Sequence, residues 1–145
     1  MIFGKHDLTL SKKNELALPA AYRPAVGRSA YLTRGFDRNL LLLPRNAFEA
    51  ITTRLNATSI SDPLSRMLRR LFLGGMVEVS VDDNGNFSLP ADLASFAGLE
   101  QGIVVIGQGD YLELWSHDQW TKQLENMQDE DANRERFEKF DLSLA

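Results

Sequence analysis

The sequence predicts an α+β fold built from two copies of one small unit, and two observations support this prediction. Alternating strands around a polar turn precede Pro-Ala at residues 8–20 and again at residues 79–91, an offset of 90 − 19 = 71 residues. A second apolar strand pair follows in each copy, with Gly35 and Gly107 at corresponding places, 107 − 35 = 72 residues apart. A repeat of this length indicates two units with one shared core, because neither contains enough apolar surface alone.

The first copy is expected to contain a hairpin, a short helix, two further strands and a second helix. Alternation of apolar and polar residues at period two predicts the hairpin. Pro19 fixes a backbone φ suited to a first helical turn, and Pro44 ends the last strand. The expected ranges are 8–10 and 16–18 for the hairpin, 20–26 for the short helix, and 30–33 and 40–43 for the strands.

An insertion with no counterpart elsewhere follows the first copy. Ser61-Asp62-Pro63 is typical of a helix start, and Gly74-Gly75 of a helix end. The apolar residues between them recur at helical spacing, which predicts a helical connection between the copies. These residues are Leu64, Met67, Leu68, Leu71 and Phe72, and the arginines that lie off their stripe are Arg66, Arg69 and Arg70.

The second copy repeats the pattern and continues into a helical end. Asn84-Gly85 favours a tight hairpin turn, because both residues adopt positive φ readily. A short helix over 92–97 and strands over 103–106 and 111–115 are expected next. Beyond His117 we expect one long helix, with Trp120, Leu124, Met127 and Phe137 on one side.

These elements divide the chain into four parts. The expected ranges are 1–55 for the first repeat, 56–75 for the inserted linker, 76–122 for the second repeat, and 123–145 for the C-terminal helix and acidic tail.

Composition excludes several functional classes. The absence of cysteine excludes disulfides and thiolate zinc sites. No apolar run approaches the roughly 20 residues that span a bilayer, and the first residues lack a signal pattern, so a cytoplasmic location is expected. No catalytic triad pattern, phosphate-binding glycine loop or metal-ligand spacing is present. We therefore expect no enzyme activity, no cofactor, no metal and no small-molecule substrate.

Charge is distributed unevenly along the chain. Residues 1–75 carry 12 Lys and Arg against 5 Asp and Glu, a balance of +7, whereas residues 76–145 carry 4 against 15, a balance of −11. Such asymmetry is typical of a protein with one face for polyanions. Head-to-tail attraction between subunits, or simple solubility, would explain it equally well.

Four segments carry a family resemblance: Leu71-Phe72-Leu73-Gly74, Ala97-Gly98-Leu99, Val105-Ile106-Gly107-Gln108 and Leu112-Glu113-Leu114-Trp115 followed by Trp120. They resemble the MraZ family, bacterial transcriptional regulators linked to the division and cell-wall gene cluster, over residues 1 to about 125. The resemblance implies two tandem AbrB-like swapped-hairpin units that form a pseudo-symmetric double-unit β-barrel. It also implies a ring-shaped homo-oligomer that binds repeated sites in double-stranded promoter DNA and associates with the nucleoid.

The hairpin loops depart from the family pattern. In the family each loop carries Asp-x-x-x-Arg, whose arginine is the expected DNA contact. Those positions are Ser11 and Glu15 in the first copy, and Asp82 and Asn86 in the second. Because phosphate contacts supply much of the affinity for DNA, the loss of both arginines weakens the expected interaction.

Other cations in the first copy are expected to contact DNA instead. Lysine supplies charge without the bidentate reading of guanine that arginine allows. The expected DNA-binding residues are Lys5, Lys12, Lys13, Arg23 and Arg34. Two alternatives remain open: an ordinary solvated basic face, and an oligomeric assembly or interaction protein, derived from the family, that has lost DNA binding.

The inserted arginines and the two tryptophans have simpler interpretations. Arg66, Arg69 and Arg70 are expected to contact acidic groups of a neighbouring subunit, with DNA contact as the alternative. Trp115 ends an apolar strand and Trp120 begins an apolar helix stripe, so both are expected in the core rather than on a base-stacking platform.

Overall fold

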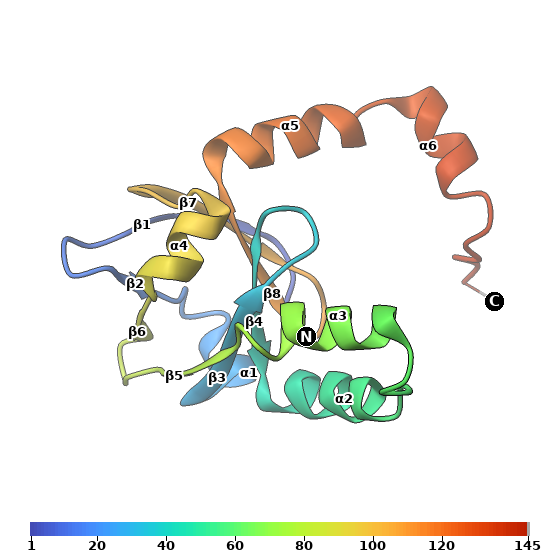
Figure 1. The fold of residues 1–145 in the computed structure, drawn as a ribbon. Coiled ribbons are helices and arrows are strands. Elements are labelled where there is room, and N and C mark those ends of the chain that lie inside the picture. The colour runs from blue at the N-terminus through green and yellow to red at the C-terminus, as the bar shows by residue number, and fades with distance from the viewer. Residues whose placement is uncertain (145) are drawn as a thin grey trace.

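The computed structural model describes residues 1–144, which form eight strands and six helices (Figure 1). The first copy and the insertion comprise β1 (Lys5–Thr9), β2 (Glu15–Ala17), α1 (Arg23–Val26), β3 (Ser29–Arg34), β4 (Leu40–Pro44), α2 (Arg45–Asn56) and α3 (Pro63–Phe72). The second copy and the C-terminal part comprise β5 (Val77–Ser80), β6 (Asn86–Ser88), α4 (Ala91–Ala97), β7 (Gly102–Gly107), β8 (Leu112–Ser116), α5 (His117–Met127) and α6 (Glu130–Arg136).

The two copies exchange strands with each other. A six-stranded antiparallel sheet has the order β1-β7-β8-β4-β3-β5, and a separate two-stranded ribbon pairs β2 with β6. Thus β1 pairs with a second-copy strand, β5 pairs with a first-copy strand, and the central pair β4–β8 also joins the copies. The predicted hairpin of residues 8–10 with 16–18 is wrong, because β1 pairs with β7 and β2 pairs with β6. Exchanging the copies leaves the strand order unchanged, so the fold has an internal pseudo-two-fold axis.

Strand register shows that the repeat is not uniform in length. Leu32 pairs with Leu42 in the first copy, and Val105 pairs with Leu114 in the second. The equivalent strands β3 and β7 are therefore offset by 105 − 32 = 73 residues. The expected equivalence of Gly35 with Gly107 is wrong by one residue, since Gly107 occupies the place of Arg34.

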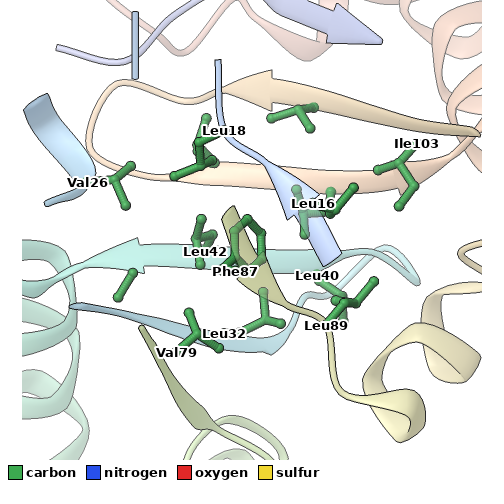
Figure 2. Close-up of a cluster of buried hydrophobic side chains, with 14 of the residues drawn as sticks. Leu16, Leu18, Val26, Leu32, Leu40, Leu42, Val79, Phe87, Leu89 and Ile103 are labelled. Atoms are coloured by element: carbon green, nitrogen blue, oxygen red, sulfur yellow. The ribbon is translucent and has the colours of Figure 1, made fainter. Parts of the chain in front are cut away.

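The main core lies between the ribbon and the sheet (Figure 2). Leu16, Leu18, Phe87 and Leu89 come from or directly follow the ribbon strands and pack with sheet residues such as Leu42, and all are at most 3% exposed. Burial of this shared apolar layer removes it from water only when both copies are present. Hydrogen bonding gives two separate sheets within residues 1–144 rather than one closed barrel, and the observed fold is α+β with mainly antiparallel strands.

A second core occupies the opposite face of the sheet. Along β4 the side chains of Leu40 and Leu42 point into the main core, and those of Leu41 and Leu43 point to the opposite face, where they pack under α2 and α3. Tyr31 stacks on Phe48 of α2 with ring centroids 3.8 Å apart. The hydroxyl of buried Thr33 donates to the carbonyl of Phe72 at 2.6 Å, which attaches the end of α3 to β3.

The helix α5 packs on β7 and β8. Trp115 is buried and meets the half-buried Trp120 edge-to-face, with ring centroids 5.7 Å apart. The prediction that these residues belong to the core is confirmed for Trp115, whereas Trp120 lies half-buried at the edge of the core. The buried carboxylate of Glu113 on β8 connects the two copies. It accepts hydrogen bonds from Asn39 of the first copy and from Gln108 and the Trp115 indole of the second, at 2.9 to 3.1 Å.

Two helices differ from their predicted ranges. The segment after Pro19 is a turn closed by a hydrogen bond from the Tyr22 N–H to the Pro19 carbonyl, and α1 begins at Arg23 rather than residue 20. The single long C-terminal helix is wrong, because Asp129 accepts a hydrogen bond from the Ala132 N–H and starts a separate helix. A capping side chain can start a new helix where the previous one would otherwise continue. The spacing of apolar residues does not predict such a break.

We predict that Leu16→Ala lowers the free energy of unfolding by about 2–5 kcal/mol, because it leaves a cavity in the layer that both copies share. Denaturant unfolding measures the change, and one cooperative transition is expected. Ala17→Ser on the exposed side of the same strand is the control and should change stability by less than about 0.5 kcal/mol. Equal effects of the two substitutions would contradict the assignment of this core.

Candidate nucleic-acid interface

The two hairpin loops, residues 11–15 and 82–86, are closed by the same hydrogen bonds. In the first loop the Ser11 hydroxyl oxygen accepts from the backbone N–H groups of Lys13 and Glu15, at 3.3 and 3.0 Å. In the second loop Oδ1 of Asp82 accepts from the N–H groups two and four residues on, at 2.9 and 2.8 Å. The first motif position therefore shapes the loop, and a serine performs this role in place of aspartate.

The fourth position of each loop has a left-handed backbone. Asn14 has φ of 58° and Gly85 has φ of 81°. These are residue types that adopt this conformation at low cost. The carbonyl of Asn14 accepts from the Leu89 N–H, and the carbonyl of Gly85 accepts from the Leu18 N–H, both at 2.8 Å. Each loop is thus anchored to the strand end of the other copy.

The fifth position is where the family pattern has arginine. In the second copy this residue forms a side-chain hydrogen bond within its own loop. The amide of Asn86 donates to Oδ2 of Asp82 at 3.3 Å. Glu15 in the first copy is half-buried at the start of β2. Neither side chain supplies a cation to a phosphate.

Four basic residues of the first copy lie at the two loops, two at each. Lys12 and Lys13 are exposed at the tip of the first loop, and neither forms an ion pair within residues 1–144. Arg23 and Arg28 lie against the second loop instead. The Arg23 Nε donates to the Leu18 carbonyl at 3.0 Å, beside Gly85, and Arg28 forms a 2.6 Å ion pair with Asp83.

This division produces a difference in charge between the loops. The first loop carries two lysines and one glutamate, a sum of +1. The second loop carries two aspartates, which the two adjacent arginines balance to zero. The positions equivalent to Arg23 and Arg28 beside the first loop are Ala94 and Gln101, so the first loop receives no arginine in return.

Ionised Asp82 is favoured by its surroundings. The backbone N–H of Asn86 is the largest cause that holds the pKa of this carboxyl below its usual 3.8, followed by the Asn84 N–H, the Asn86 amide and the charge of Arg23. The carboxylate is therefore the form that closes the second loop.

The remaining predicted DNA-binding residues lie away from the tips. Lys5 is exposed at the opposite end of β1 from the first loop. The guanidinium of Arg34 lies 4.8 Å from the ring centroid of Phe96, and its Nε is buried without a hydrogen-bond partner in the described chain. The structure does not bring either residue to Lys12 and Lys13.

Two of the three arginines of α3, Arg66 and Arg69, donate hydrogen bonds within their own chain. The Arg69 guanidinium donates to the Thr58 carbonyl at 2.6 Å, and that of Arg66 donates to the Ile60 carbonyl at 2.9 Å. Both therefore support the loop between α2 and α3. Arg70 is exposed.

Within residues 1–144, no group of three or more His, Asp and Glu side chains is arranged to hold a metal ion. In the same range, every helix is too short or too polar to cross a bilayer.

Sequence comparison identifies the family of this two-copy scaffold. The profile of the MraZ protein family matches residues 1–71 and, separately, residues 72–141. The chain belongs to the MraZ family. The two matches correspond to the two copies that exchange strands, and the resemblance seen in the sequence is confirmed.

Relatives named Transcriptional regulator MraZ align over nearly the whole chain. The protein from Herpetosiphon aurantiacus is 36% identical over 130 residues, covering 90% of this chain and 91% of its own length. That from Thermomicrobium roseum is 36% identical over 86% of this chain and 88% of its own, and that from Rhodococcus jostii is 35% identical over 94% and 92%. The similarity to these relatives therefore spans both copies of the repeat.

We predict a pH response confined to the second loop. Because the folded-state pKa of Asp82 is lowered, its contribution to stability is complete above the usual pKa of 3.8 and is lost as pH falls through the lowered value. NMR titration of the side-chain carboxyl should give a lower pKa in the folded chain than in urea. Amide exchange at Asn84 and Asn86 should accelerate once the carboxyl is protonated, while the Ser11 loop is unaffected. An identical pKa in both states would contradict the loop geometry.

Proposed function

We propose that this MraZ-family chain is a transcriptional regulator that binds double-stranded promoter DNA through its first hairpin loop. The observation that carries the proposal is the exposed Lys12-Lys13 tip, held on a rigid loop with a net positive charge. The relatives' name supports the regulatory role. Binding requires no catalytic step, and the protein acts in the cytoplasm at the nucleoid.

The loop suits contact with the DNA backbone better than base recognition. A β-ribbon fits the major groove, and the proposed contact places the exposed loop between β1 and β2 against the phosphates beside that groove. Lys12 and Lys13 supply point charges there, with Arg23, Arg34 and Lys5 acting further from the tip. Sequence preference then arises from the groove shape and from repeated spacing of sites rather than from bidentate contacts.

One loop with a charge of +1 binds weakly, so several copies must act together. We propose a ring-shaped oligomer on repeated promoter sites, with the division and cell-wall gene cluster as the regulated region. Linked loops raise affinity without any new contact, provided that the spacing of the loops matches that of the sites. We propose that the exchange of strands within each subunit is the swapped-hairpin arrangement of two AbrB-like units, without a closed barrel among the described residues.

A second candidate function is an assembly protein that has kept the oligomer and lost DNA binding. Glu15 and Asn86 at the positions of the family's arginines favour this alternative, as does the ion pair that occupies Arg28. Such a protein would form mixed rings with an intact relative and would show no DNA affinity of its own.

We predict that Lys12→Glu/Lys13→Glu abolishes the gel shift of DNA taken from upstream of the gene that encodes this chain. For the unsubstituted protein, log affinity should fall with log salt concentration, at a slope of about 0.9 per phosphate contact, and the substitutions remove up to two contacts per loop. Arg54→Glu/Lys122→Glu, exposed on α2 and α5, makes the same charge change elsewhere and should retain most binding. A salt-independent or absent shift with the unsubstituted protein would favour the assembly function.

We predict that Asp83→Asn strengthens DNA binding. It removes one negative charge and releases Arg28 from its 2.6 Å ion pair, so the second loop gains a positive charge. The salt slope measured by fluorescence anisotropy should become steeper by up to one unit per engaged loop. Asp110→Asn, in the exposed turn before β8, is the matched control and should leave the slope unchanged. Equal slopes for both variants would show that the second loop does not face DNA.

A further inference from the structure

The helix α3 has a second apolar face that its own chain does not cover. Leu68 and Phe72 pack toward the sheet, whereas Leu64 and Met67 are 71% and 62% exposed and Leu71 is 36% exposed. The last three lie at positions i, i+3 and i+7, on one side of the helix. We call them the α3 ridge. The predicted single apolar stripe is therefore divided between an inner face and this ridge.

Arginines border the ridge. Arg66 and Arg70 are one helical turn apart and both are exposed, beside the ridge on the side away from the sheet. An apolar strip bordered by cations is unusual on a surface that faces only water. Its chemistry fits a partner that combines apolar side chains with carboxylates.

The C-terminal segment of the chain has that chemistry. Residues 129–144 contain six Asp and Glu against three Lys and Arg, a balance of −3. Phe137 and Phe140 are 54% and 58% exposed, and Leu142 and Leu144 are almost fully exposed. Glu138 and Asp141 alternate with these apolar residues, whereas Lys139 lies over the Phe140 ring at 5.2 Å from its centroid, so residues 137–144 carry a balance of −1. This segment therefore carries the apolar groups and the negative charge that the ridge lacks.

The helix α6 (Glu130–Arg136), which precedes the apolar end of this segment, is held away from the sheet. The Arg136 guanidinium donates to the carbonyl and side-chain oxygens of Asn126 at 3.0 and 2.9 Å, and the Asn133 amide donates to the Met127 carbonyl at 2.7 Å. These bonds hold α6 against the end of α5, and both project away from the sheet (Figure 1). The segment is thus presented outward for another molecule.

Charge decides between the two ways in which a second copy can cover the ridge. If two ridges faced each other, Arg66 and Arg70 of both copies would gather in one contact, which like-charge repulsion opposes. A C-terminal segment from another copy instead brings Glu138 and Asp141 to these arginines. Such a contact joins different surfaces of the two copies, so it continues from copy to copy and closes into a ring when the rotation permits.

We propose that residues 137–144 of one copy dock on the α3 ridge of the next, with Phe137 and Phe140 on the ridge and the neighbouring carboxylates on Arg66 and Arg70. The inference rests on the proposed function only in that it supplies the oligomer which that function uses. Each contact is small and weak alone, and closure of the ring makes the contacts mutually reinforcing.

Cysteine cross-linking tests the contact directly, because the natural chain has no cysteine. The full chain carrying Met67→Cys and Phe140→Cys should form a ladder of covalent multimers under mild oxidation. Met67→Cys alone should stay monomeric in denaturing gels, and so should Phe140→Cys combined with Ser88→Cys on the exposed side of β6. A cross-linked monomer would show docking within one chain, and multimers from Met67→Cys alone would show ridge-to-ridge pairing. Either result overturns the proposal.

Truncation and charge exchange separate this inference from the DNA-binding proposal. A chain ending at Arg136 should lose the native-mass oligomer, while its unfolding midpoint at concentrations too low for assembly equals that of the full chain, since the removed residues are exposed. Arg66→Glu/Arg70→Glu should do the same, and mixing it with Glu138→Arg/Asp141→Arg should restore mixed oligomers. An intact oligomer after truncation overturns the inference. Residual DNA binding by the truncated chain at low salt, and its loss on adding Lys12→Glu/Lys13→Glu, reports on the loop apart from the oligomer; no difference between these two chains would contradict the proposed function and not the docking contact.

Discussion

A reciprocal pair of hydrogen bonds between the copies, from the Leu89 N–H to the Asn14 carbonyl and from the Leu18 N–H to the Gly85 carbonyl, governs the arrangement of this molecule. They hold the ends of the β2–β6 ribbon, and the ribbon holds the apolar layer over the sheet. They also anchor each loop where it turns. The contacts that close the core therefore also set the geometry of the two loops that the proposed function places on DNA.

Much of the fold was accessible from the sequence because its signals are local. Alternation at period two, the Pro-Ala step and Asn84-Gly85 each specify a strand, a turn or a helix start over a few residues. The exchange of strands left no such signal, since periodicity tells which face is buried but not which strand is the neighbour. The break at Gln128 was missed for a related reason: the cap at Asp129 acts against an apolar pattern that continues through it.

The sequence was enough to predict which types of residue form the candidate site, but it predicted the position of only some of them in the fold. Lys12 and Lys13 lie on a turn that the sequence itself defines, and they are exposed there. Arg23 and Arg28 follow the first loop in sequence, yet strand exchange carries them to the second. The role of Ser11 as a loop-closing acceptor was also hidden, although a hydroxyl followed by a tight turn is a signal that could have revealed it.

Covalent joining of the copies has a consequence for how the molecule sits on a double helix. A symmetric dimer of separate units would present two identical ends, and it would bind equally well after a half-turn. Here the reach of Arg28 to Asp83 neutralises one end alone, while the lysine end keeps its charge. The two ends of each subunit therefore differ in charge, so the subunit has one preferred orientation on the duplex. All subunits in a row would share that orientation.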